Sequence, residues 1–547
     1  MSNDRKVRVR FAPSPTGPLH MGGVRTALYN YLFAKKHGGD FILRIEDTDQ
    51  TRFVPGAEAY IIESLKWCGI MPNEGVGFSA NGRIPVESGG DGEHKPYRQS
   101  ERKEMYREYA EQLVKSEHAY YAFDTPEDLD EARQRMEKAG GTFMYNAITR
   151  QNMKNSLSLS ADEVKKRIDA GENYVIRIKI PRNEEVRLQD LIRGWVVVQS
   201  AQMDDKVLFK SDGMPTYHLA NVVDDYKMQI THVIRGEEWL PSAPLHVLLY
   251  QYLGWESVMP QFAHLPLLLK PDGNGKLSKR DGDRLGFPVF PLNWIDPVTK
   301  EQSSGYREKG YFPEAFINML ALLGWHASGN KELFTLEELV QEFSLERVSK
   351  SGAKFDPEKS KWFNQQYLRM KSDEELADDF MEEVKGKMEE KAEGKWQKAD
   401  GKVEMAEGKW QKADGKVDKI YVKKVCGLIK EKANFTNEFW SLGSYFFEDP
   451  TSYDEGVVKK RWNEKSKAFI SEMASAYKTT DDFSVLNTEN VLKATCEKLG
   501  IKTGEVMQLF RVCISGVAGG PALFEVVALL GKDTVVHRLE KSVIQIK

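Results

Sequence analysis

Residues 7–20 read VRVRFAPSPTGPLH, and this segment indicates the fold class. Every second residue at its start is apolar, which is the pattern of a β-strand with one buried face. A proline- and glycine-rich turn then leads into a helical stretch at 20–36, and a second strand, FILRI, is expected at 41–45. A strand, a turn, a helix and a second strand in this order form a βαβ unit. We therefore expect an α/β protein built on a parallel sheet.

The composition of the 547-residue chain is that of a globular protein, with 41% hydrophobic residues and a formal net charge of −4. It excludes a mainly disordered chain and a globally basic nucleic-acid binder, although local basic surfaces remain compatible with it. The longest apolar stretches, 243–253 and 317–325, fall short of the ~20 residues that span a bilayer. The start has no apolar signal region, and the four cysteines form no C-x-x-C pair. We expect a cytoplasmic protein without a cysteine-rich zinc site.

The residue pattern differs from region to region along the rest of the chain. Charged helical stretches and an alternating strand at 174–180 give residues 117–210 the character of an insertion. Strand-like runs resume at 231–235 and 264–269, and after about residue 283 the pattern is predominantly helical. The stretch AEGKWQKADGKV occurs twice within 392–417. Its polar content predicts an exposed expansion without a direct catalytic role.

Charged side chains gather where the expected strands end. Arg10 closes the first strand, Glu46 follows the second, Arg235 ends a later one, and KLSKR (276–280) follows the fourth. Ligands of open parallel sheets bind outside the carboxyl ends of the strands, so these charges should share one pocket. Arginines suit a carboxylate, Glu46 an ammonium group, and the lysines of KLSKR a polyphosphate. Each feature taken alone also fits a solvated strand end or an exposed basic loop.

The turn at 13–23 adds a second nucleotide feature. It leads into a helix start, where free backbone N–H groups and the helix dipole favour phosphate. His20 places an imidazole there, and Gly22 allows a ligand to approach closely. The alternative is an ordinary helix-start histidine. The ordered combination of this turn with the later KLSKR loop favours a nucleotide site.

The motifs together resemble those of bacterial-type glutamyl-tRNA synthetases, which are class I aminoacyl-tRNA synthetases. The resemblance covers essentially the whole chain, with the duplicated segment and part of 287–311 as apparent additions. It is carried by RFAPSPTG (10–17), RIEDTD (44–49), YRQS (97–100), KSDG (210–213), PTYHLANVVDD (215–225), RGEEW (235–239), KLSKR (276–280), FTLEE (334–338) and LFEVVALLG (523–531).

This resemblance implies an α/β Rossmann-like catalytic domain with a doubly wound parallel sheet and an α+β insertion, followed by all-α C-terminal domains. The expected boundaries are 1–116 and 211–284 for the two halves of the catalytic domain and 117–210 for an inserted acceptor-end-binding domain. A helical stem-contact region is expected at 285–371. A helical anticodon-binding domain is expected at 372–547, with the duplicated segment 392–417 on its surface.

The resemblance also implies roles for individual residues. Arg10, Arg235 and Tyr217 would hold the γ-carboxylate of glutamate, and Glu46 its ammonium group. Further positions of the glutamate site are Ala12, Ser14 and Asn221. The ATP site would be formed by His20, Gly22, Glu238, Leu269, Lys276, Leu277, Ser278, Lys279 and Arg280. The side chains expected to act in catalysis are His20, Lys276 and Lys279, the last of which would contact the triphosphate in the transition state.

The implied reaction begins with in-line attack of the glutamate α-carboxylate on the α-phosphorus of ATP, which is expected to carry Mg²⁺. The glutamyl group then passes to the terminal adenosine of tRNA(Glu), and activation itself needs bound tRNA. Two positions depart from related patterns. Gly23 stands where the general class I signature has a second histidine, and YAFDT (121–125) lacks the Cys-x-Cys of a zinc knuckle. The missing cysteines predict no zinc and no protein metal site. The resemblance also implies a monomer.

Other functions are less consistent with these residues. A neutral glutamine side chain would leave two arginines uncompensated, and a truncated relative that modifies a tRNA base lacks the C-terminal helical half. A non-catalytic tRNA-binding paralogue would not need His20 or Lys279. A non-discriminating enzyme that also glutamylates tRNA(Gln) stays open. Candidate anticodon contacts, against the alternative of solvated lysines and core aromatics, are Lys423, Lys424, Lys430, Arg511, Trp440, Tyr445 and Phe446.

Overall fold

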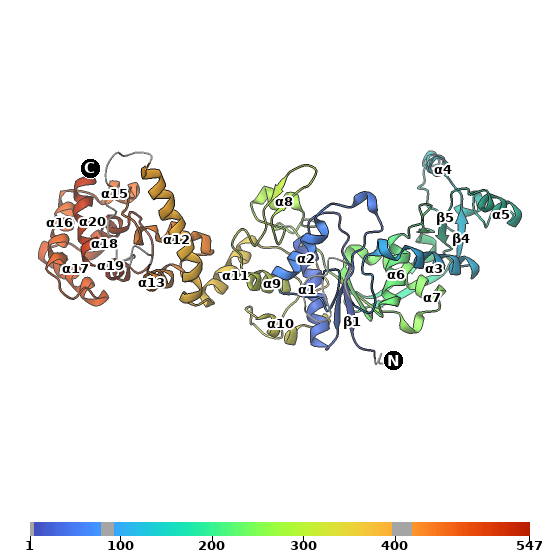
Figure 1. Ribbon diagram of the computed structural model, residues 1–547, viewed down its shortest axis with the longest axis horizontal. Coiled ribbons are helices and arrows are strands. Elements are labelled where there is room, and N and C mark those ends of the chain that lie inside the picture. Colours follow the sequence, from blue (N-terminus) through green and yellow to red (C-terminus); the bar gives the residue numbers. More distant parts are fainter. Residues whose placement is uncertain (1–4, 78–91, 397–417, 547) are drawn as a thin grey trace. The chain divides into compact units, whose positions relative to one another are not determined.

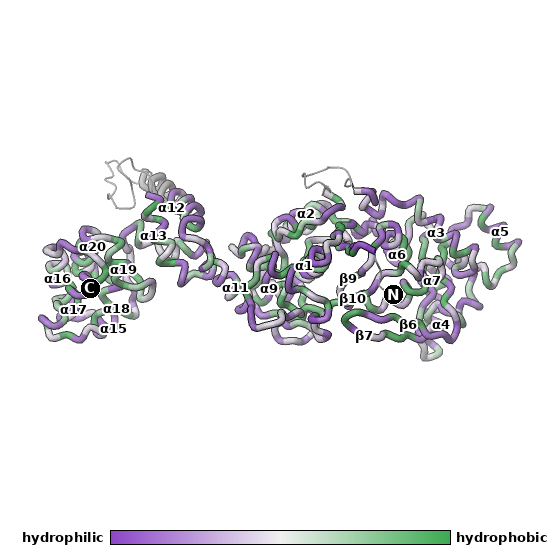
Figure 2. Tube along the Cα trace, turned by 90° about the horizontal axis from the view of Figure 1, so that it is seen from below, coloured by the Kyte–Doolittle hydropathy of each residue, from purple (hydrophilic) through white to green (hydrophobic). Residues whose placement is uncertain are grey.

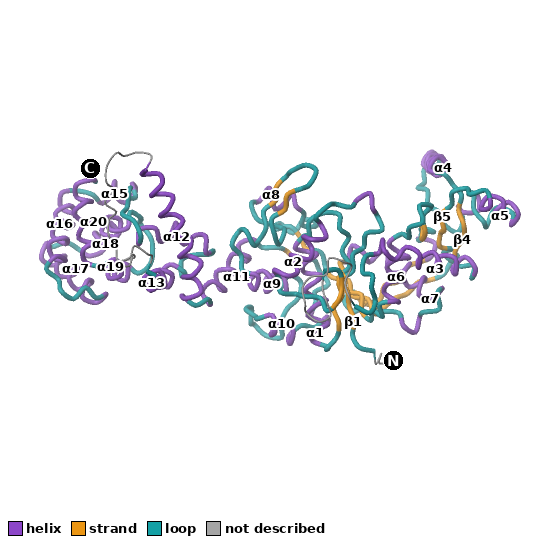
Figure 3. The backbone as a smooth tube through the Cα atoms, in the orientation of Figure 1, coloured by secondary structure: helices purple, strands orange, loops and turns teal. Residues whose placement is uncertain are grey.

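The computed structural model describes residues 5–77, 92–396 and 418–546. The chain forms two compact units, Met1–Ser360 and Lys361–Lys547. Among the described residues the strands belong to the first unit, whereas the second consists of helices and loops (Figure 3). The duplicated segment at 392–417 lies largely outside the described residues.

A parallel sheet forms the centre of the first unit (Figure 1). Strand β1 (Arg8–Phe11) pairs with β2 (Asp40–Leu43), which pairs with β3 (Glu74–Gly75), all in parallel. A second set contains β9 (His232–Gly236) and β10 (Gln261–Leu265), also parallel. The two sets meet where the backbone N–H of Thr231 donates to the Arg8 carbonyl at 2.9 Å. The parallel α/β sheet predicted from the strand–helix pattern is confirmed.

Helices complete the βαβ pattern around these strands. The connection between β1 and β2 is α1 (Met21–Lys36), which packs against both strands. Apolar residues of α1, including Val24 and Leu28, are fully buried. The helices α6 (Tyr217–Lys227) and α7 (Ala243–Tyr252) precede β9 and β10, respectively. Hydrophilic and hydrophobic stretches alternate along the chain in both units, as expected for elements that bury one face (Figure 2).

Residues 117–210 divide between a separate lobe and a hairpin. The lobe has an antiparallel sheet of β4 (Ala119–Ala122), β5 (Val175–Ile178) and β8 (Val207–Phe209), with α4 (Pro126–Lys138) and α5 (Ala161–Asp169). The hairpin of β6 (Glu185–Asp190) and β7 (Gly194–Gln199) instead joins the parallel set, because β6 pairs with β10 at Asp190 and Phe262. The stretch with the texture of an insertion therefore also extends the central sheet.

The stretch after residue 283 contains short strands as well as the expected helices. Strand β11 (Leu268–Leu269) pairs with β14 (Ala353–Lys354), and β12 (Trp294–Ile295) pairs with β13 (Gln302–Ser303). The further helices of this unit are α2 (Ala57–Trp67), α3 (Lys103–Lys115), α8 (Lys279–Leu285), α9 (Pro313–Ala321) and α10 (Leu336–Glu342). Helix α11 (Pro357–Met370) crosses the boundary between the units.

The second unit is built from helices around an aromatic and aliphatic core. They are α12 (Asp373–Trp396), α13 (Lys419–Ile429), α14 (Phe439–Gly443), α15 (Glu455–Arg461), α16 (Glu464–Lys478), α17 (Val485–Leu499), α18 (Thr503–Ser515), α19 (Leu523–Leu530) and α20 (Lys532–Gln545). Tyr445 and Phe446 are 5% and 2% exposed, so these two side chains are core aromatics that cannot stack on nucleotide bases. None of the described helices is long and apolar enough to cross a membrane.

Candidate active site

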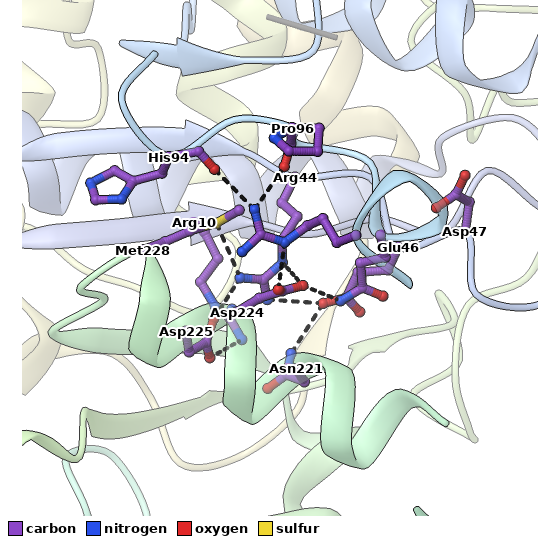
Figure 4. A network of polar contacts seen from close by, with 12 residues as sticks. Arg10, Arg44, Glu46, Asp47, His94, Pro96, Asn221, Asp224, Asp225 and Met228 are labelled. Atoms are coloured by element: carbon purple, nitrogen blue, oxygen red, sulfur yellow. Dashed lines mark hydrogen bonds and ion pairs between the residues drawn. The ribbon is translucent and has the colours of Figure 1, made fainter. Parts of the chain in front are cut away.

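Charged side chains at the ends of β1 and β2 form a buried network with α6 (Figure 4). Arg10 donates through Nε and Nη2 to the two carboxylate oxygens of Asp225, at 3.0 and 3.2 Å. Arg44 donates to Asp225 at 2.8 Å and to Oε1 of Glu46 at 3.0 Å. The Asn221 amide also donates to Oε1 of Glu46, at 3.1 Å. The topology thus brings Arg10 and Glu46 together, as the strand-end argument predicted, and α6 adds Asn221.

Within the described residues the hydrogen bonds of Arg10 use Nε and Nη2 and those of Glu46 use Oε1, which leaves Nη1 of Arg10 and Oε2 of Glu46 without a hydrogen bond. Burial raises the pKa of Glu46 above its ordinary value, and the charges of Arg44 and Arg10 offset this only in part. A further positive group at Oε2 would stabilise the ionised form. The network therefore has an open acceptor suited to an ammonium group beside an open guanidinium donor.

Arg235, in β9, is surrounded by neutral partners. It donates to His264 Nε2 at 3.0 Å, to the Tyr217 hydroxyl at 2.7 Å and to the Trp239 carbonyl at 3.3 Å. The residue is 5% exposed, and no carboxylate of the described chain forms an ion pair with it. Burial lowers the pKa of Arg235 and the charge of Arg10 acts in the same direction, whereas Tyr217 and the carboxylates of Asp225 and Glu46 offset this only in part. A buried cation of this kind is costly unless an anion reaches it, which points to an anionic ligand.

Ala12 and Ser14 follow Arg10 in the loop after β1. The loop is tied to the end of β2, because the backbone N–H of Glu46 donates to the Pro13 carbonyl at 3.0 Å. Ala12 is half-buried and Ser14 is exposed. Both backbone positions therefore lie beside Glu46, and the side chain of Ser14 makes no hydrogen bond within the described residues.

His20 caps α1 and presents an unpaired donor. Its Nδ1 accepts a hydrogen bond from the Gly22 backbone N–H at 3.1 Å, so the proton of the neutral ring lies on Nε2. Within the described residues Nε2 is buried without a partner. Burial, together with the charge of Lys276, lowers the pKa of His20 to about 4. The ring is therefore neutral near pH 7 and can donate to a ligand next to a lysine.

The loop that carries Lys276 is anchored from both sides. Leu269 and Lys276 form an antiparallel bridge, and Leu277 is 3% exposed. Lys276 donates to Glu238 at 2.9 Å. Burial alone would raise the pKa of Glu238, but the hydrogen bond and charge of Lys276 lower it overall. Lys276 thus lies close to both Glu238 and His20.

The second lysine of the loop points to a different partner. Lys279 donates to Glu301, in the turn between β12 and β13, at 2.8 Å. Ser278 caps α8 through its backbone and hydroxyl contacts with Asp281, and Arg280 is exposed. Lys279 is thus engaged by a carboxylate in the region that contains the apparent addition.

Several partners in this site were not predicted as site residues. Asp225 and Arg44 were quoted only as parts of motifs, and His264 only as the start of a strand-like run. A signal existed for Asp225, because Asp224 and Asp225 end the apolar run of α6 with two consecutive carboxylates. Asp224 accepts from Arg102 at 2.8 Å and is fully buried. Paired acidic residues in an apolar helix predict buried cationic partners.

The depressed histidine pKa values predict a pH dependence of stability. Burial holds the pKa of His20, His218 and His232 at about 4, against an ordinary value near 6.5. Between pH 7 and pH 5 the unfolded chain takes up protons at these rings and the folded chain does not, so the free energy of unfolding falls as the pH falls. The largest loss in the free energy of unfolding is about 2 kcal/mol for each histidine. Urea unfolding at the two pH values measures it.

His232→Gln is the informative variant for this measurement, because glutamine does not titrate. It should show a smaller loss of stability between pH 7 and pH 5 than the unmodified protein. An identical loss in both proteins would contradict the origin assigned to it.

Comparisons with known proteins agree with this geometry. A family model for the catalytic domain of class I tRNA synthetases (E and Q) matches residues 6–362, and an anticodon binding domain model matches residues 402–543. Glutamate–tRNA ligases of Cytophaga hutchinsonii and Flavobacterium johnsoniae are 52% and 54% identical to the chain. These alignments cover 99% and 98% of this chain and 98% and 99% of the two relatives.

Two solved structures are similar over the full chain. The glutamate tRNA ligase from Elizabethkingia meningosepticum, in complex with its amino acid, is 46% identical with a TM-score of 0.87. The glutamate-tRNA synthetase from Elizabethkingia anophelis is also 46% identical, with a TM-score of 0.85. Each comparison covers 99% of this chain and 100% of the other.

The parallel α/β sheet, with its charged side chains at the strand ends, is that of a class I aminoacyl-tRNA synthetase. The matches extend over both units and across the whole chain. The chain belongs to the glutamate–tRNA ligase family.

The described residues contain no group of three or more His, Cys, Asp or Glu side chains that could hold a metal ion.

Proposed function

We propose that this protein is a glutamate–tRNA ligase, which activates L-glutamate with ATP and transfers it to the terminal adenosine of tRNA(Glu). One observation carries the choice of amino acid: Arg235 is buried, has only neutral partners and lies near Arg10. A carboxylate side chain compensates this charge, whereas the amide of glutamine would not.

The open atoms of the network give the substrate its orientation. The γ-carboxylate binds Arg235, with Tyr217 and Nη1 of Arg10 as further donors, and the ammonium group binds Oε2 of Glu46. Ala12, Ser14 and Asn221 line this pocket. Held at both ends, the amino acid presents its α-carboxylate to ATP with little rotational freedom.

The nucleotide binds beside His20, Gly22, Glu238 and Leu269, and KLSKR approaches its phosphates. An α-carboxylate oxygen forms a bond to the α-phosphorus while the bond to the bridging oxygen breaks and pyrophosphate leaves. Chemistry of this kind needs positioning and charge stabilisation, with no covalent nucleophile from the protein. His20 donates from Nε2, and Lys276 and Lys279 neutralise phosphate charge. We expect Mg²⁺ to arrive bound to ATP as part of the substrate.

The domain tasks follow the same proposal. The lobe within 117–210 holds the acceptor end of the tRNA, residues 285–371 contact its stem and the second unit reads the anticodon. Lys424 is exposed and is a candidate phosphate contact. We expect the enzyme to act in the cytoplasm as a monomer.

Charging assays with separated tRNAs test the function. The purified protein should attach glutamate to tRNA(Glu), and pyrophosphate exchange should require glutamate and tRNA together. Glutamine should support neither reaction. Charging of tRNA(Gln) with glutamate would identify a non-discriminating enzyme, and failure to charge either tRNA with glutamate would refute the proposal.

Lys279→Ala is expected to lower kcat for charging by roughly a hundredfold or more, the scale of one lost transition-state charge contact. Folding should be unaffected, because the partner of Lys279 is the exposed Glu301 and surface ion pairs contribute little to stability. Steady-state charging and thermal unfolding measure the two effects. Glu301→Gln is the matched control and should keep its activity, since it leaves Lys279 free for phosphate. A Lys279→Ala enzyme within threefold of the original rate would contradict the phosphate role.

A further inference from the structure

Arg235 and His264 are cross-strand neighbours. Strands β9 and β10 run in parallel with Arg235 opposite His264 in the register. The Nε of Arg235 donates to Nε2 of His264 at 3.0 Å, and His264 is 0% exposed. The contact therefore lies within the sheet, and it involves the guanidinium that we assign to the substrate carboxylate.

The protonation state of His264 follows from its partners. A guanidinium has only N–H donors, so Nε2 of His264 must accept and carries no proton. The ring proton then lies on Nδ1, whose partner is Oδ2 of Asp190 at 2.6 Å. Burial lowers the pKa of His264, and the charges of Arg235 and Arg193 act in the same direction while Asp190 opposes them. The neutral ring with the proton on Nδ1 is the state that satisfies both neighbours.

Asp190, which orients the ring of His264, is itself held by hydrogen bonds and by strand pairing. Its Oδ1 accepts from the backbone N–H groups of Ile192 and Arg193, at 2.9 and 2.8 Å, in the turn between β6 and β7. The residue itself pairs with Phe262 of β10. Asp190 comes from the hairpin that joins the sheet from within 117–210, and it is 2% exposed. Two backbone hydrogen bonds and the strand pairing thus fix the carboxylate that orients the histidine.

We propose that Asp190 and His264 are positioning residues that orient Arg235 for an acidic side chain while leaving its charge unneutralised. A carboxylate in direct contact with Arg235, like Asp225 on Arg10, would orient the guanidinium but compete with the substrate. A neutral imidazole orients it without cancelling its charge, and Asp190 keeps the imidazole in its accepting tautomer. This inference rests on the proposed function, because it takes glutamate as the ligand of Arg235.

Variants that separate orientation from general packing test the proposal. His264→Leu removes the acceptor. Asp190→Asn, with Oδ1 still accepting from the turn, places an amide N–H against Nδ1 and shifts the ring proton to Nε2, where it opposes the N–H of Arg235. Both should raise KM for glutamate roughly tenfold or more and leave KM for ATP within twofold. His264→Gln offers a carbonyl oxygen to Arg235 and should stay within about threefold of the original KM. His232→Gln, at the start of β9, is the matched control.

A folded His264→Leu enzyme with unchanged KM for glutamate would overturn the proposal, and so would equal increases in KM for glutamate and ATP. Calorimetric titration with glutamate alone provides a second readout, in which His264→Leu and Asp190→Asn should bind more weakly and His264→Gln should not. If the unmodified protein binds glutamate but charges no tRNA, the proposed function fails and this comparison of variants still decides the positioning role.

Discussion

Arg235→Leu should lower kcat/KM for glutamate by about a thousandfold. In the unmodified protein the side-chain carboxylate of the substrate would bind a buried guanidinium whose other partners are neutral. Truncating one member of a desolvated charge pair costs about 2–5 kcal/mol, because the other member is left buried and unpaired. A thousandfold loss corresponds to about 4 kcal/mol, in the upper half of that range. Steady-state charging with glutamate as the varied substrate measures it.

The same substitution should change the free energy of unfolding by less than about 1 kcal/mol. Leucine loses three hydrogen bonds to neutral groups, but it also removes a cation whose burial is unfavourable in the free enzyme. Arg235→Lys is the matched control: it keeps the charge but loses the fork geometry, and it should retain more activity than leucine does. Activity of Arg235→Leu within tenfold of the original would remove Arg235 from the glutamate site.

The positions of the charged residues at the strand ends could be predicted from the sequence, because they depend on local patterns. Alternating apolar residues indicate the strands, and charges at strand ends of a parallel sheet must point to one edge. Arg10, Glu46 and Arg235 could therefore be placed together without coordinates. The spacing of Thr335 and Glu338 is likewise a local signal for the start of α10, where Thr335 accepts from the backbone N–H of Glu338 at 3.2 Å.

The different partners of Arg10 and Arg235 could not be predicted from the sequence. Arg10 and Arg235 are equivalent as strand-end residues, but α6 places Asp225 on Arg10, and β10 places a neutral histidine on Arg235. The first pairing joins residues 215 positions apart and the second joins residues 29 apart, and no local periodicity encodes either. The same holds for β6, whose pairing with β10 delivers Asp190 to His264. Which arginine is paired with a carboxylate of the chain and which has only neutral partners is decided in the folded chain.

That distinction predicts the opposite behaviour for Asp225. Asp225→Asn should lower the free energy of unfolding by about 3–5 kcal/mol, the cost of breaking a buried ion pair by removing one partner. Asp225 is 2% exposed and accepts from both Arg10 and Arg44, so the neutral amide leaves two buried guanidinium groups under-compensated. The pKa of Asp225 is below its ordinary value, since the charges of Arg10 and Arg44 outweigh burial, and the ionised form therefore contributes stability at neutral pH. Urea unfolding at pH 7 measures the loss.

Asp49→Asn is the matched control, because Asp49 pairs with Arg52 on the surface and its loss should not shift the unfolding midpoint measurably. The stability that Asp225 contributes should also disappear from the original protein as the pH falls through the depressed pKa of this carboxyl group, and Asp225→Asn should lack that part of the acid sensitivity. If Asp225→Asn proves as stable as the control, the network does not depend on this carboxylate, and Arg10 would be as available for the substrate as Arg235. If instead Asp225→Asn loses stability and Arg235→Leu loses activity, the charge of Arg10 is balanced mainly within the fold, and that of Arg235 is balanced by the ligand.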